Sequence, residues 1–170
     1  MTRARRDDRL TTADPAERAR EIALRILSNA PRSAAQLRER LVARDVAPEL
    51  ADELIERYRE VGLLDDAGLA AMIVRTRRAE RGLAPRAIRV ELVRKGFEPA
   101  DIARALADDD GSIDPRALEI ARRKWDALHT SDEATRTRRV VALLARKGYS
   151  PGAAFAVVKD WQRADKAGID

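Results

Sequence analysis

Apolar residues recur along this chain at spacings of three and four positions, with charged and small residues between them. Examples of such pairs are Ile22 and Ile26, Leu37 and Leu41, Ile88 and Leu92, and Val140 and Leu144. This is the period of an amphipathic helix, and no segment shows the sustained alternation of a half-buried strand. The pattern predicts an all-α protein with helices over residues 15–29, 34–44, 48–61, 66–81, 85–95, 99–108, 115–129, 136–147 and 151–164.

Proline marks several of the expected helix starts, because it is favoured at the first helical position and disruptive farther in. Asp14-Pro15 and Asp114-Pro115 each combine an N-cap carboxylate with such a proline. Pro48, Pro99 and Pro151 each come two residues after a hydrophobe that follows a polar or glycine break. These last three prolines occupy equivalent places in a longer pattern.

The same arrangement of residues occurs three times along the chain. At offsets of 51 and then 52 residues, the set Leu37, Leu41, Val46 and Pro48 is matched by Ile88, Leu92, Phe97 and Pro99 and by Val140, Leu144, Tyr149 and Pro151. Gly96 and Gly148 suit the left-handed position that ends a helix, where the following aromatic residue can pack back on the last turn. Each copy is too small to bury its apolar stripe well, so neighbouring copies should stack.

The repeat predicts three tandem three-helix repeats stacked into an elongated, curved right-angled array. We place repeat 1 at residues 14–62, repeat 2 at 63–110 and repeat 3 at 111–164, with a mobile N-terminal tail over 1–13 and a C-terminal tail over 165–170. Aromatic residues at helical spacing or at the repeated turn are expected in the core. They are Tyr58, Phe97, Tyr149 and Phe155, with Trp125 and Trp161 as further packing residues.

Composition narrows the classes of function. The 170 residues include 34 Lys and Arg against 29 Asp and Glu, a net charge of +5, and a hydrophobic fraction of 45% suffices for a buried core. With no cysteine and one histidine, disulfides, thiolate zinc sites, cysteine nucleophiles and multi-histidine metal sites are excluded. No apolar run approaches the ~20 residues that cross a bilayer, and the first residues lack the apolar segment of a signal peptide. We expect a soluble, cytoplasmic protein that does not contact a membrane.

The sequence fits no enzyme template. It has no glycine-rich phosphate loop, and no serine or threonine is arranged plausibly beside His129 for nucleophilic catalysis. The acidic groups Asp65-Asp66 and Asp108–Asp110 are more typical of helix caps and solvated breaks than of a magnesium site. We therefore expect no catalytic residue, no metal and no cofactor.

Charge is distributed unevenly along the chain. Residues 75–95 contain eight cations and two acids, residues 134–150 five cations and no acid, and residues 45–66 eight acids and two arginines. Crowded cations would be relieved by a polyanionic or acidic partner, and arginine favours bidentate contacts to phosphate or carboxylate. The alternative is that these charges are solvated helix faces with pairs three or four residues apart. The candidate binding residues are Arg75, Arg77, Arg78, Arg86, Arg89, Arg94, Lys95, Arg139, Arg146 and Lys147.

Several motifs together resemble the bacterial RecX family, whose members regulate the recombinase RecA. They are Gly62-Leu63-Leu64-Asp65-Asp66, the arginines Arg75 and Arg77, Gly82-x-x-Pro85-x-x-Ile88-x-x-Glu91-Leu92-x-x-Lys95-Gly96, Ala121-Arg122-Arg123-Lys124-Trp125 and Arg146-Lys147-Gly148-Tyr149. The resemblance covers nearly all of residues 16–161. The chain departs from the family where Gly68-Leu69-Ala70 replaces the usual Arg-Phe-Ala, where Ile73 replaces Phe, and where Ala84 replaces Gly.

The resemblance implies a non-enzymatic, monomeric protein that binds along the groove of the RecA filament on single-stranded DNA. Such proteins block filament extension and so depress ATP hydrolysis, strand exchange and cleavage of the SOS repressor. Contacts to single-stranded and double-stranded DNA would carry no sequence specificity. Two alternatives are a helix-turn-helix transcription regulator and a helical protein-interaction scaffold. The first is disfavoured because the second helices of its candidate motifs begin with the acidic turns at Pro48-Glu49 and Pro99–Asp101, which phosphates would repel.

Overall fold

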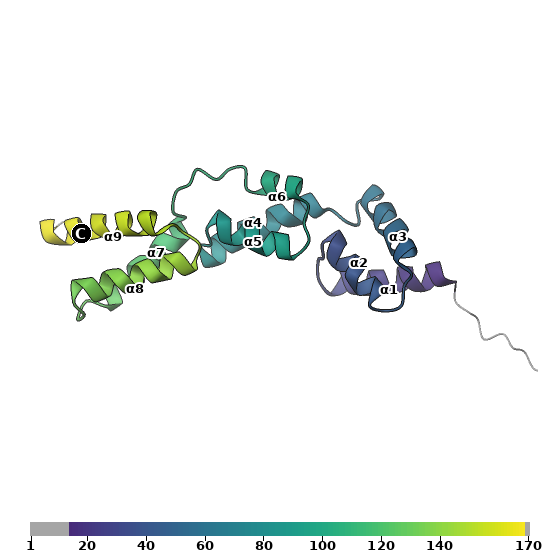
Figure 1. The fold of residues 1–170 in the computed structure, drawn as a ribbon, viewed down its shortest axis with the longest axis horizontal. Helices are drawn as coiled ribbons and strands as arrows, with labels where there is room; N and C mark the ends of the chain where they lie inside the picture. Colours follow the sequence, from purple (N-terminus) through teal and green to yellow (C-terminus); the bar gives the residue numbers. More distant parts are fainter. Residues whose placement is uncertain (1–13, 169–170) are drawn as a thin grey trace, which may run out of the picture. The chain divides into compact units, whose positions relative to one another are not determined.

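The computed structural model describes residues 14–168, and within that range the chain folds into helices joined by short loops, with no strand (Figure 1). The helices are α1 (Pro15–Asn29), α2 (Ala34–Val42), α3 (Pro48–Glu60), α4 (Asp66–Arg81), α5 (Pro85–Arg94), α6 (Pro99–Ala105), α7 (Pro115–Ala127), α8 (Glu133–Arg146) and α9 (Pro151–Ala167). They occur where the apolar period predicts them, and the expected tail over 1–13 lies outside the described residues.

Three helix ends differ from the prediction by three residues, and the others agree within two. Helix α6 ends at Ala105, and the following residues form a turn. Helix α8 begins at Glu133, earlier than predicted, because the carboxylate of Asp132 caps it by accepting the N–H of Thr135 at 2.8 Å. Helix α9 continues to Ala167, into the segment that we expected to be a C-terminal tail.

The contacts between helices divide the chain into two compact units, with the boundary in the sequence between Asp65 and Asp66. In the first unit, α1, α2 and α3 surround a core that includes Leu37, Leu41 and Tyr58. Helix α2 begins with a capping box in which Ser33, fully buried, and Gln36 each bond the other's backbone. This unit is one three-helix repeat with its own core.

The second unit contains two further three-helix groups, each with its own core. Helices α4, α5 and α6 pack around residues such as Ile88, Leu92 and Phe97. Helices α7, α8 and α9 pack around residues such as Trp125 and Leu144. The chain therefore forms three tandem three-helix repeats, as the sequence offsets predict.

The same backbone turn ends the second helix in every repeat. The turn residue has a positive φ, of 62° at Asp45, 76° at Gly96 and 97° at Gly148. The next residue donates its N–H to the carbonyl five positions earlier at 3.2 Å: Val46 to Leu41, Phe97 to Leu92, and Tyr149 to Leu144. This is the Schellman arrangement, and its hydrophobic pair is buried in all three copies. The predicted left-handed positions of Gly96 and Gly148 are confirmed.

Repeats 2 and 3 approach each other so closely that two glycines are required. A Cβ atom on Gly82, which has a φ of 57°, would lie 2.5 Å from the backbone nitrogen of Ala117 at the start of α7. A Cβ atom on Gly148 would lie 2.8 Å from the Cβ of Ala87 on α5. Both contacts place backbone of one repeat directly against the other.

Hydrogen bonds complete this junction. The hydroxyl of Tyr149 donates to the carbonyl of Gly82 at 3.2 Å and accepts the N–H of Asp114 at 3.1 Å. The N–H of Ala84 donates to the carbonyl of Lys147 at 2.9 Å. Burial raises the pKa of the Tyr149 phenol, so this hydroxyl stays protonated as a donor over the physiological range. Tyr149 thus serves both the turn of its own repeat and the contact with repeat 2.

A carboxylate near the end of α9 explains why this helix runs past its predicted end. Trp125 on α7 is almost completely buried and donates its indole N–H to Asp165 at 3.0 Å. The guanidinium of Arg136 lies over the Trp125 ring, 3.9 Å from its centre, and comes within 3.8 Å of the same carboxylate. Asp165 therefore fastens the last turns of α9 to α7 and α8.

One core prediction is wrong. Tyr58, Phe97 and Tyr149 are buried as expected, but 52% of Phe155 is exposed. Helix α9 buries the stripe formed by Ala154 and Val158, and Phe155 is about 100° farther around the helix axis from Ala154. The side chain therefore lies at the edge of the buried face rather than within it.

The close approach at Gly82 predicts a specific cost of adding one methyl group. Gly82→Ala should reduce the free energy of unfolding by about 2–4 kcal/mol, because the methyl group must adopt a left-handed conformation and also displace backbone. Gly111→Ala is the matched control: Gly111 has a φ of 75°, but a Cβ atom there would meet no other atom within 4 Å, so only the conformational cost of about 1 kcal/mol applies. Urea unfolding followed by circular dichroism measures the free energy of unfolding of both variants. An equal loss of stability in the two would contradict the close contact at Gly82.

Candidate functional site

Arg77 is engaged in holding repeat 2 together. From α4 it donates two hydrogen bonds to the carboxylate of Glu91 on α5, at 2.8 and 2.7 Å, and both side chains are largely covered. These bonds lower the pKa of the Glu91 carboxyl and raise the pKa of the Arg77 guanidinium. The structure therefore does not present Arg77 as an unpaired cation, although the predicted contact set includes it.

Three other predicted contact residues also have internal partners. Arg78 lies 3.8 Å from Asp109, and Lys95 lies 3.9 Å from Glu91. The ammonium of Lys147 donates to the carbonyl of Arg81 across the junction of repeats 2 and 3. Burial, and secondly the nearby charge of Arg116, lower the pKa of Lys147. These cations hold helices and loops in place.

The remaining predicted residues are exposed and form no ion pair with any residue between 14 and 168. They are Arg75 on α4, Arg86, Arg89 and Arg94 on α5, and Arg139 and Arg146 on α8. On α5, Arg86 and Arg89 share the outward face with Val90 and Val93, which are 64% and 61% exposed. This face therefore combines unpaired positive charge with apolar side chains.

Helix α8 presents a related face, and the sequence prediction omitted one residue of it. At the offset of 52 residues, Arg138 and Arg146 correspond to Arg86 and Arg94, and Ala142 corresponds to Val90. Arg138 is exposed and forms no direct ion pair with Asp132, whose pKa is lowered mainly by hydrogen bonds from Thr135 and to a smaller extent by the charge of Arg138. The repeat offset that aligned the apolar positions was the signal that could have identified Arg138.

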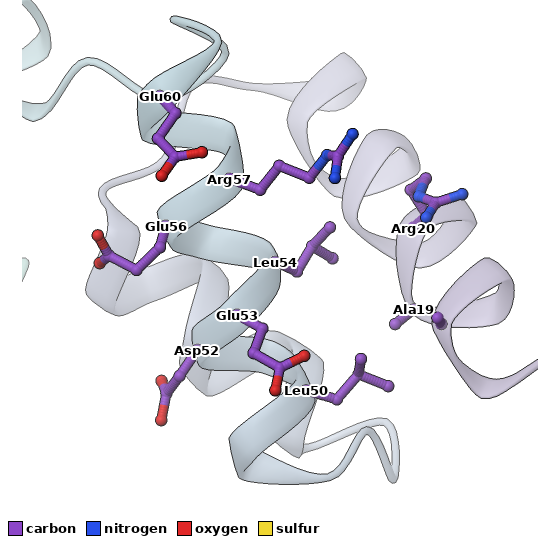
Figure 2. A pocket seen from close by; sticks show the side chains of 10 residues that line it. Ala19, Arg20, Leu50, Asp52, Glu53, Leu54, Glu56, Arg57 and Glu60 are labelled. Carbon is purple, nitrogen blue, oxygen red and sulfur yellow. The ribbon is translucent and has the colours of Figure 1, made fainter.

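Two grooves lie within single repeats. One, of about 750 Å³, is apolar and lies between α8 and α9, where Val141, Ala142 and the exposed Phe155 line it. The other, of about 630 Å³, lies between α1 and α3 in the first unit (Figure 2).

The groove of the first unit is bordered by acidic side chains. Figure 2 shows Arg57 reaching from α3 towards α1, while Asp52 and Glu56 point from the other side of α3. Part of this negative charge is neutralised internally, because Arg38 donates to Asp52 at 2.6 and 3.0 Å. Glu53 and Glu60 form no ion pair with any described residue.

The family assignment follows from the repeats. Three family models, described as the first, second and third three-helix domains of RecX, match residues 19–57, 65–106 and 115–158 in order. The chain belongs to the RecX family. The regulatory protein RecX of Streptomyces coelicolor is 41% identical over 158 residues, which cover 92% of this chain and 83% of that protein. The regulatory protein RecX of Thermobifida fusca is 37% identical over 155 residues, which cover 90% of this chain and 83% of that protein.

Solved RecX structures share the fold. The crystal structure of RecX from Lactobacillus salivarius matches with a TM-score of 0.77 at 19% identity, over 87% of this chain and 97% of that chain. The crystal structure of regulatory protein RecX matches with a TM-score of 0.73 at 27% identity, over 87% of this chain and 73% of that chain. The predicted all-α architecture of tandem three-helix repeats is confirmed.

The motif residues that carry the RecX resemblance are mainly structural. Gly82 and Gly96 adopt left-handed conformations, and Glu91 holds Arg77. Ala84, which replaces the glycine usual in the family, is buried at the junction of repeats 2 and 3, and its N–H is bonded to Lys147. Gly68, where the family usually has arginine, lies on an exposed part of α4.

Two negative findings apply to residues 14–168. Over this range the side chains contain no cluster of three or more His, Asp or Glu that could hold a metal ion. Among these helices, none has both the length and the apolar composition that a bilayer crossing requires.

The pair Arg77–Glu91 predicts a pH dependence of stability. Because the folded protein holds the pKa of Glu91 below its unfolded value of about 4.3, the pair stabilises the fold above that pH and is lost as the pH falls through the folded pKa. Glu91→Gln should reduce the free energy of unfolding by about 1–2 kcal/mol at pH 7, and by much less at pH 3. Urea unfolding at pH 7, 5 and 3 measures this difference.

Asp160→Asn is the control for that experiment. Asp160 forms a pair with Arg163 on α9 in which both side chains are about 70% exposed. Removing this charge should change the free energy of unfolding by less than about 0.5 kcal/mol. A Glu91→Gln effect that is equally small at pH 7, or that does not shrink on acidification, would contradict the proposed clamp.

Proposed function

We propose that this chain binds the recombinase RecA on single-stranded DNA and inhibits filament extension, and so depresses ATP hydrolysis, strand exchange and cleavage of the SOS repressor. Membership of the RecX family and relatives named regulatory proteins support this role. The protein acts as a cytoplasmic monomer and by binding, without catalysis.

One observation carries the proposal: helices α5 and α8 expose arginines at matching positions with no carboxylate paired to them in the described chain. Arg86 and Arg94, at the start and the end of α5, correspond to Arg138 and Arg146 on α8. Guanidinium groups bind phosphate and carboxylate oxygens in bidentate fashion. The same arginine spacing on two helices suits a partner whose phosphates or subunits also repeat. Phosphate contacts of this kind carry no sequence information and weaken with salt.

The acidic side of the first unit supports a contact of opposite sign. Glu53 and Glu60 on α3 are exposed and form no ion pair with described residues. A partner with both polyanionic and basic surfaces, as a protein filament on DNA has, would be oriented by such charge separation.

The test is the ATPase activity of RecA on single-stranded DNA, titrated with this protein. The variant Arg86→Glu/Arg89→Glu/Arg94→Glu should require at least tenfold more protein for half inhibition, because it replaces the exposed positive charge of α5 with negative charge. The matched control is Arg18→Glu/Arg25→Glu/Arg40→Glu, which reverses three exposed arginines of the first unit. It should stay within twofold of the unaltered protein.

Circular dichroism must show unchanged helix content in both variants. Equal inhibition by the α5 variant and the unaltered protein would contradict the proposed surface, and no inhibition by the unaltered protein would contradict the proposed function. Competition between DNA duplexes of different sequence tests the alternative of a transcription regulator. A sequence-specific protein would prefer one duplex by orders of magnitude, whereas the proposed function predicts near-equal affinities.

A further inference from the structure

The apolar groove of repeat 3 has features that packing of the chain does not require. Helix α8 contributes Ala134, Val141 and Ala142, and helix α9 contributes Phe155. Phe155 leaves about half of its surface in water and shares the groove lining with Val141 and Ala142. Burying the exposed part of a phenylalanine ring against a partner is favourable, so this residue is a natural anchor for a ligand.

The groove is formed before any ligand arrives. The amide of Gln162 on α9 donates to the hydroxyl of Thr137 on α8 at 2.9 Å, and both residues line the groove. One turn farther along α9, Lys166 lies 3.6 Å from Glu133 at the start of α8. These contacts fix the spacing of the two helices, so a ligand need not order them.

Glu133 lines the groove but is paired with Lys166, so the charge left unpaired around the groove is positive. Arg138 lines it from α8, Arg139 is the next residue, and Lys159 lies one turn after Phe155 on α9. All three are exposed, and none forms an ion pair with a residue of the described range. The acidic groups nearest to Arg138 in sequence, Asp132 and Glu133, bond the backbone of Thr135 and the ammonium of Lys166 respectively.

We infer that this groove binds an amphipathic helix of a protein partner, with apolar side chains three or four residues apart and acidic side chains on both flanks. A groove between two helices fits such a segment, its apolar stripe would cover Phe155, and its carboxylates would meet Arg138 and Lys159. This ligand lies beyond the function proposed above, because its anchor Phe155 is no part of the arginine surface of α5 and α8, and Arg138 is the one residue that both proposals use.

The other occupants fit less well. Single-stranded nucleic acid is bound by several aromatic side chains on which successive bases stack, but Phe155 is the one aromatic residue that lines this groove. A second copy packed symmetrically would place the cations of one groove against those of the other. The positions equivalent to Phe155 hold Ala103 in repeat 2 and Asp52 in repeat 1, so the anchor belongs to repeat 3 alone.

The experiment measures the fluorescence anisotropy of labelled 16-residue peptides with the full-length protein. The peptides of the first panel have leucine or phenylalanine at helical spacing, flanked by glutamate. The second panel has lysine in place of glutamate, and the third has the residues of the first panel in scrambled order. Acidic amphipathic peptides should bind, and the other two panels should bind at least tenfold more weakly. Phe155→Ala and Lys159→Glu should each weaken binding of the acidic panel at least tenfold.

Leu24→Ala is the control, because Leu24 is a hydrophobe on α1 that is 49% exposed. It should leave peptide affinity within twofold, with helix content unchanged in every variant. Absence of binding by the whole acidic panel, or affinities unaffected by Phe155→Ala, would overturn the inference. So would a Phe155→Ala protein that loses labelled oligo(dT) binding while peptide binding stays intact, or a dimer in sedimentation that Phe155→Ala dissociates. None of these results alters the RecA inhibition expected of the α5 surface, so the two proposals fail separately.

Discussion

The turn that ends the second helix of each repeat is the constraint on which the rest of the architecture depends. A positive φ at Asp45, Gly96 or Gly148 reverses the chain, and the next hydrophobe packs on the helix just completed. That geometry sets where the third helix of each repeat begins. In repeat 3 the same turn also contacts repeat 2. Because Gly148 has no side chain, Ala87 can pack directly against it, and the hydroxyl of Tyr149 donates to the carbonyl of Gly82. One local conformation thus closes a repeat and joins it to the preceding one.

The arginines of this chain divide into two groups that composition cannot separate. Arg77 and Arg136 lie against partners from other helices: Glu91 for the first, and the ring and carbonyl of Trp125 for the second. Arg86 and Arg89 point outward beside exposed valines. The partners of these structural arginines lie 11 to 14 residues away, so a count of charges does not show which arginines are bound. A smaller set of arginines, on matching faces of α5 and α8, is available to a partner.

Much of the fold was predictable because it is determined locally. Apolar spacing, proline at the first helical position and glycine after the last one act within a few residues, so the helices and repeats could be found from the sequence. The contact of Asp165 with Trp125 spans 40 residues and has no local signal. The prediction for Phe155 is wrong because its three-residue spacing to Val158 is also helical, so periodicity alone does not fix which side of α9 faces the core. The sequence did not show which of the predicted cations have internal partners, since ion pairing is decided by tertiary packing.

The contact between Gly82 and Ala117 has a consequence for how this architecture can be rearranged. Although the sequence repeats every 51 or 52 residues, the backbone of repeat 2 rests on the first turn of α7 with no side chain between them. A length of one repeat is therefore not an interchangeable block in this part of the chain. A chimera that exchanges or duplicates repeats would have to transfer α4 through α9 together. Otherwise it would need a matched glycine and alanine at the new junction between repeats.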